Sequence, residues 1–153
     1  MLKQSHIPTF MVAAGAIALG ACETVNRAVN EVVGNNFAAN LRGANEVPRG
    51  DPDGVGTARI SINDATNQIC TRLEVRNIGP VTAAHIHPGR AGVNGPPVVN
   101  LDAPDDNDSD DCDMVADALV DQIRRFPANF YVNVHTAQYP NGAIRGQIYN
   151  VQG

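Results

Sequence analysis

The chain has 153 residues, with 16 acidic and 11 basic side chains and a formal net charge of −5. This length suffices for one domain with a buried core and is too short for two. Fourteen glycines, ten prolines and no tryptophan favour a turn-rich β fold over a helical bundle. The basic side chains form no cluster, which excludes the electrostatic footprint of a nucleic-acid-binding protein.

The first residues predict export and a lipid anchor. Lys3 precedes an apolar run over 10–19 that is too short to span a membrane and ends in small residues. We therefore expect residues 1–21 to be a signal peptide. Leu19-Gly20-Ala21-Cys22 resembles the lipobox of bacterial lipoproteins, in which the cysteine is acylated and becomes the new N-terminus. A plain secretory signal with an incidental cysteine is the alternative.

Acylation of Cys22 would make the protein a membrane-anchored lipoprotein that is periplasmic or exposed at the cell surface. Residues 22–35 are then expected to be a polar tether. The remaining cysteines, Cys70 and Cys112, form an even pair in an oxidising compartment. Alternation places Cys70 on the polar side of a strand, and Cys112 falls in an acidic loop expected at 104–113. We predict a Cys70–Cys112 disulfide.

Short apolar runs separated by turns predict the strands of the domain. In chain order the expected strands are 38–41, 55–63, 68–77, 80–87, 98–101, 129–136 and 143–151. Apolar spacing predicts one helix over 116–125, with an apolar stripe of Val115, Leu119, Val120, Ile123 and Phe126. Arg145 and Gln147 are expected as edge or cross-strand polar residues. The fold class is all-β: an antiparallel β-sandwich of the Greek-key or immunoglobulin-like type, with one short helix near 115–126.

Four stretches carry a resemblance to one family. They are 41–48 (LRGANEVP), 54–58 (GVGTA), 84–89 (AHIHPG, followed by Asn94-Gly95-Pro96) and 130–148 (FYVNVHT, then PNGAIRGQI). Their order and spacing resemble the CHRD domain, first named from chordin, and place a domain over 36–151. The resemblance implies an exported protein of unassigned activity. The growth-factor partner of chordin does not carry over to a single lipoprotein domain, so the protein partner stays open.

Three of the four histidines can converge. His85 and His87 are two residues apart on one expected strand and share a face, while His135 shares a face with Asn133 on another. If the two strands are neighbours with matched faces, three imidazoles meet. Neutral imidazole suits Zn²⁺ or Cu²⁺, and three protein ligands plus water make an open site. A His-x-His pair on a strand also resembles the copper site of copper/zinc superoxide dismutases.

Polar packing is the alternative for these histidines. His85 and His87 end a strand and can hydrogen-bond the Gly-rich turn at 88–97, and His135 can do the same for the turn at 139–142. Catalysis is the weakest reading, because no nucleophile with an adjacent base and no paired carboxylates stand out. The acidic residues 105–111 lack the glycine and the bidentate glutamate of an EF-hand loop, so a solvated loop is favoured over a calcium site.

Two functions therefore remain. The first is a non-enzymatic binding or envelope-interaction module, attached to the membrane by its lipid. The second is a copper- or zinc-binding protein, with a superoxide-dismutase-like activity as its enzymatic form, that uses His85, His87 and His135.

Overall fold

The computed structural model describes residues 35–151. The expected signal peptide at 1–21, the acylation of Cys22 and residues 22–34 of the expected tether lie outside the described residues. In the part of the chain that is described, none of the helices has the length and apolar character needed to cross a membrane.

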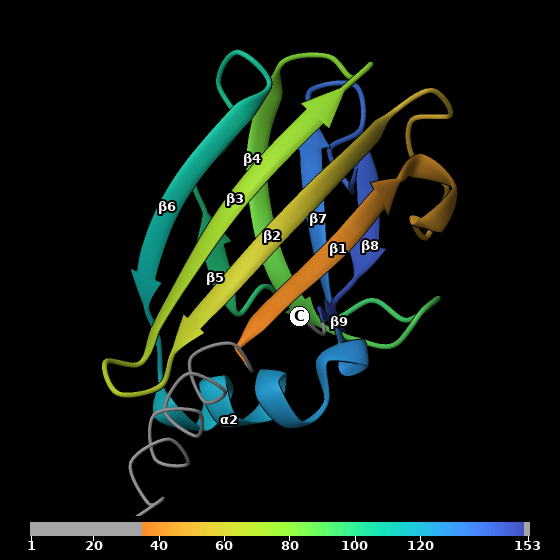
Figure 1. Ribbon diagram of the computed structural model, residues 1–153. Coiled ribbons are helices and arrows are strands. Elements are labelled where there is room, and N and C mark those ends of the chain that lie inside the picture. The colour runs from red at the N-terminus through yellow and green to blue at the C-terminus, as the bar shows by residue number, and fades with distance from the viewer. Residues whose placement is uncertain (1–34, 152–153) are drawn as a thin grey trace, which may run out of the picture.

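A nine-stranded antiparallel sheet curls into two facing layers (Figure 1). The strand order is β5-β4-β7-β8-β1-β2-β3-β6, and β9 also pairs with β1. The strands are β1 (Asn36–Arg42), β2 (Val55–Asn63), β3 (Gln68–Arg76), β4 (Val81–Pro88), β5 (Val99–Leu101), β6 (Asp108–Met114), β7 (Phe130–Thr136), β8 (Ile144–Gln147) and β9 (Tyr149–Asn150). The helices are α2 (Asp117–Arg125) and the 3₁₀ turns η1 (Gly43–Asn45) and η2 (Pro127–Asn129). The expected all-β sandwich with one short α-helix is confirmed.

The core lies between the two layers and is built by strand alternation, which sends every second side chain inward. Its fully buried members include Phe37, Leu41, Ile60, Leu73, Ile86, Val132 and Ile144. Helix α2 closes one end of the sandwich and inserts Val120 and Ile123 into the core (Figure 1). Phe126, which was expected on the same stripe, is 60% exposed because it follows the last turn of the helix.

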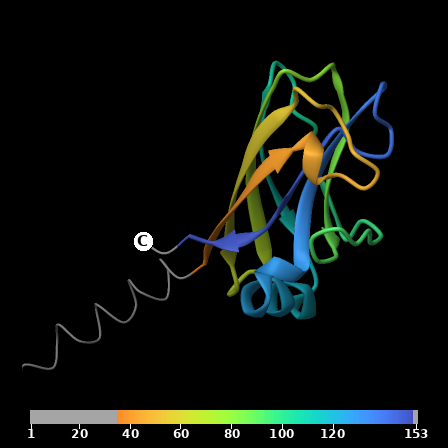
Figure 2. The same cartoon turned by 90° about the vertical axis from the view of Figure 1, so that its right-hand side faces the viewer.

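Figure 2 shows that the described chain begins and ends at the same place. The backbone N–H of Val151 donates to the carbonyl of Asn36 over 2.9 Å. The loops 43–54, 89–97 and 137–143 all lie on one side of the molecule in this view, outside the layer that contains β4, β7 and β8. This layer therefore has a covered outer face, and the functional candidates lie on it.

Two sequence expectations about local structure are wrong. Most of the acidic loop expected at 104–113 belongs instead to β6 (Asp108–Met114), which pairs with β3 along its length. Backbone pairing with a neighbouring strand overrides the low β-propensity of aspartate, because alternate carboxylates at the end of a sheet still reach water. The single strand expected over 143–151 is divided at Ile148: β8 pairs with both β7 and β1, whereas β9 pairs with β1.

Candidate metal-binding site

Strands β4 and β7 are neighbours and bring the three predicted histidines together. Asn133 on β7 lies directly opposite His85 on β4. His135 lies opposite Ala83, two residues before His85. The polar sides of the two strands face the same way, as alternation requires. One nitrogen from each of His85, His87 and His135 lies within 4.8 Å of the others. Among the described residues 35–151, these three histidines are the group of ligand-type side chains that lie close enough together to share a metal ion.

The Nδ1 atoms of two histidines are held by backbone carbonyls. His87 Nδ1 lies 2.8 Å from the carbonyl oxygen of Gly95, and His135 Nδ1 lies 2.9 Å from that of Pro140. A carbonyl can only accept a hydrogen bond, so each Nδ1 donates. In a neutral ring the remaining nitrogen, Nε2, then carries a lone pair. Metal-binding histidines are commonly oriented by such an N–H bond to a carbonyl.

The free lone pairs point toward a common place. His135 Nε2 lies 3.1 Å from His85 Nδ1. The Oδ1 atom of buried Asn133 lies 3.0 Å from His87 Nε2 and 3.1 Å from His135 Nε2. Four potential ligand atoms therefore surround one small volume between β4 and β7.

The environment favours the neutral forms of His85 and His87. Burial lowers the pKa of His85 below its ordinary value of 6.5, and the nearby charges of His135 and His87 lower it further. Burial also lowers the pKa of His87, against the opposing hydrogen bonds with Gly95 and Asn133. A neutral imidazole is the form that binds a metal ion.

Arg145 supports the site from β8. It is 1% exposed, and its Cζ lies 3.3 Å from the centroid of the Tyr131 ring, on which His87 stacks at 4.8 Å. Its guanidinium donates to the carbonyls of Arg90 and Val93 and to Asn94 Oδ1, and so fastens the 89–97 loop over the sheet. The three distances are 3.0, 2.8 and 2.9 Å. The sequence expectation of an edge or cross-strand residue missed this burial.

Glu46 is the second residue that sequence reasoning missed. It is 4% exposed, and a Cβ added at Gly142 would overlap its carboxyl group. Burial raises its pKa from 4.5 to about 7, although the charge of Arg145 and hydrogen bonds with Val47 and Asn133 act in the other direction. Nothing in the local pattern marks it, because it lies in a loop. Its one signal is its place within the 41–48 stretch.

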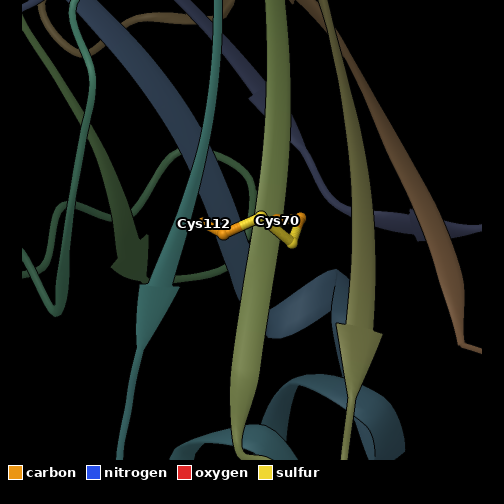
Figure 3. Close-up of a disulfide and its surroundings, with 2 residues drawn as sticks. All are labelled: Cys70 and Cys112. Atoms are coloured by element: carbon orange, nitrogen blue, oxygen red, sulfur yellow. A yellow bond between two sulfur atoms is a disulfide. The ribbon is translucent and has the colours of Figure 1, made fainter.

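The predicted disulfide is present but belongs to the other layer. Cys70 on β3 and Cys112 on β6 are directly opposite each other, with an S–S distance of 2.05 Å (Figure 3). The bond joins two neighbouring strands of the sheet and does not take part in the histidine cluster. The disulfide prediction is therefore confirmed, while the loop expected around Cys112 is replaced by a strand.

The comparisons with known proteins agree with the motifs. The sequence model of the CHRD domain matches residues 37–148, which include β1 from its second residue, β2 to β8 and every residue of the cluster. Neither a curated protein nor a solved structure matches the chain. On the strength of the family match, this protein belongs to the CHRD domain family.

Proposed function

We propose that this CHRD domain is a non-enzymatic module that binds one transition-metal ion, Zn²⁺ or Cu²⁺, through His85, His87 and His135. The observation that carries the proposal is the pair of Nδ1–H bonds to the carbonyls of Gly95 and Pro140. They leave two Nε2 lone pairs beside the nitrogen of a third histidine. Membership of the CHRD family supports the non-enzymatic role.

The alternative, in which the histidines only hydrogen-bond the turns and bind no metal, explains less of the geometry than a metal site does. It explains why His87 and His135 bond to the carbonyls of the turns that follow them. It does not explain His85, whose Nδ1 contacts another imidazole nitrogen rather than a loop. Two neutral imidazoles can share one proton at this contact, but a metal ion uses both lone pairs.

Export and lipid anchoring at Cys22 belong to the same proposal. The apolar run at 10–19 and the small residues before Cys22 support it. The Cys70–Cys112 disulfide supports it independently, because such bonds persist in oxidising compartments. Mass spectrometry of the mature chain from a membrane fraction should find an acylated N-terminal Cys22, and Cys22→Ala should abolish the modification.

Calorimetry on the purified mature chain in detergent, after removal of metal by a chelator, tests metal binding. We expect one Zn²⁺ or Cu²⁺ per chain. His87→Gln and His135→Gln should each weaken binding about 100-fold, since a first-sphere ligand contributes at least as much as the 10–100-fold of an outer partner. Glutamine can still donate to the carbonyl, so these variants retain the loop hydrogen bond. Wild-type protein that binds neither metal stoichiometrically would overturn the proposal.

A further inference from the structure

The position of Asn133 raises a chemical problem that a bound cation would solve. Its Oδ1 faces His87 Nε2 at 3.0 Å and His135 Nε2 at 3.1 Å. Both nitrogens carry lone pairs in the neutral rings, because the Nδ1 atoms hold the protons. Asn133 Oδ1 and His87 Nε2 therefore face each other as two acceptors in a buried place, whereas His135 Nε2 can accept a hydrogen bond from His85 Nδ1 at 3.1 Å. Buried acceptors without a donor are costly.

Rotation of the Asn133 amide would place its NH₂ group toward the histidines, but Glu46 opposes this. Glu46 Oε1 is buried and has no hydrogen-bond partner among the described residues, and its neighbour Asn133 lowers the pKa of the Glu46 carboxyl group. Only the NH₂ end of the Asn133 amide can act as a donor toward this oxygen. Rotation would instead turn the amide oxygen toward the carboxylate. Glu46 is buried against Gly142 and cannot move aside without displacing the 139–142 turn. The amide oxygen is thus held toward the two Nε2 atoms.

The distances suit a shared cation. A tetrahedral Zn²⁺ site with bonds of about 2.0–2.1 Å has ligand-to-ligand edges of about 3.3–3.4 Å. The two edges from Asn133 Oδ1 and the edge between His85 Nδ1 and His135 Nε2 measure 3.0, 3.1 and 3.1 Å. The histidine nitrogens, which lie up to 4.8 Å apart, need to approach by about 1.4 Å at most to close the remaining edges between histidines.

We infer that Asn133 is the fourth protein ligand, through Oδ1, and that Glu46 is the positioning residue that holds its amide oxygen toward the metal. This inference rests on the proposed metal-binding function. Three imidazole nitrogens and one amide oxygen make a closed four-coordinate site in place of the open site expected from the histidines alone. A closed site holds a metal ion without offering a position for substrate, as structural metal sites do.

Cobalt is the probe, because Co²⁺ replaces Zn²⁺ in tetrahedral sites and its visible absorption reports coordination. The mature chain in detergent is loaded with one equivalent of Co²⁺ and titrated with azide. We expect a four-coordinate spectrum that azide does not change. Asn133→Ala should weaken Co²⁺ binding by about 10–100-fold and acquire an azide-dependent spectrum, because water or anion enters the fourth position.

Two further variants keep the test decisive if Asn133→Ala does not fold. Asn133→Asp keeps an oxygen in place and should bind Co²⁺ at least as tightly as wild type, without an azide response. Glu46→Gln should weaken binding by about tenfold, because a glutamine amide can present either its oxygen or its nitrogen to Asn133. Asn133→Asp that binds Co²⁺ more weakly than wild type would count against the inference.

The outcomes separate the two proposals. A wild-type chain that binds one Co²⁺ and changes its spectrum with azide has an open site, which overturns the role of Asn133 but leaves the histidine site intact. An Asn133→Ala chain that binds Co²⁺ with wild-type affinity and does not respond to azide would also overturn the role of Asn133 and leave the histidine site intact. A wild-type chain that binds no Co²⁺ and no Zn²⁺ overturns the metal site itself.

Discussion

The two layers of the sandwich have outer faces with the same sequence pattern and opposite environments. On β2 and β3, the outward residues Arg59, Arg72 and Glu74 are in or near solvent, and the last two form an ion pair of 3.4 Å. On β4 and β7, the outward residues His87 and Asn133 are buried. Strict alternation of apolar and polar residues therefore identifies the face of a strand but not whether solvent reaches it.

Loops make the difference between the two faces. Asn94 of one loop donates to the carbonyl of Val47 of another over 2.6 Å, so the two loops cover the β4–β7–β8 face together. His87 and Arg145 bond to the backbone of the 89–97 loop from below. Polar side chains on a covered face must be hydrogen-bonded to one another, and this requirement concentrates chemistry there. The uncovered face has no such requirement.

Replacement of Arg145 should have the largest effect of the variants that test the difference between the covered face and the open face. Arg145→Leu removes the donor to the carbonyls of Arg90 and Val93 and the stacking on Tyr131. We expect a loss of roughly 3–5 kcal/mol in the free energy of unfolding, typical of disrupting a buried charged network. Arg72→Leu on the open face is the matched control, with a change of about 1 kcal/mol or less. Equal effects in urea denaturation would remove the distinction between the faces.

Removal of the disulfide should affect stability without affecting the site. Cys70 and Cys112 are separated by 42 residues, and closing such a loop stabilises by about 4 kcal/mol through the unfolded chain. Cys70→Ser combined with Cys112→Ser should therefore lower the free energy of unfolding by about this amount. Zn²⁺ affinity, measured by calorimetry below the unfolding transition, should equal that of wild type. A parallel loss of affinity would mean that the two layers are coupled.

Glu46, which is buried on the covered face, should make the free energy of unfolding depend on pH. The folded protein holds its proton up to a pH of about 7, whereas the unfolded chain releases it near 4.5. The folded state therefore binds more protons between these values, and the contribution of Glu46 falls as pH rises from 4.5 to 7. Glu46→Gln removes this fall and should gain about 3 kcal/mol over wild type between pH 4.5 and 8.

The pH dependence that His85 and His87 give to stability has the opposite sign to that of Glu46. It cancels when the wild type is compared with Glu46→Gln. The pKa values of His85 and His87 are lowered by burial, so their contribution is present above about 6.5 and is lost as pH falls. His85 and His87 are present both in the wild type and in Glu46→Gln, so their contribution is the same in the two proteins. Denaturant unfolding of the metal-free proteins at both pH values isolates Glu46, and parallel stability curves would contradict a raised pKa.

The smallest effect is expected on the open face. Glu74→Gln breaks the ion pair with Arg72, whose two side chains are 37% and 52% exposed. Such pairs contribute about 0.2–1 kcal/mol, and salt screens them. We expect a change within this range in urea denaturation, decreasing further at high salt. A larger, salt-independent change would mean that this face is covered in solution.

Much of this fold follows from sequence periodicity. The strand expected at 55–63 coincides with β2, and alternation correctly placed His85 and His87 on one face of their strand and His135 on the same face as Asn133. Glu46 and Arg145 were not recognised because their burial is produced by loops from distant parts of the chain, which periodicity does not describe. The same limit explains β6, whose strand form depends on pairing with β3 rather than on its own composition.

Strand β6 has a consequence for how neighbouring molecules meet. It is a terminal strand of the sheet, and the strand at the other end, β5, has only three residues. An open terminal strand can recruit the backbone of another molecule and start aggregation. The four aspartates of β6, Asp108, Asp110, Asp111 and Asp113, would bring like charges together in any such pairing. The acidic run thus opposes backbone pairing between molecules at this edge of the sheet.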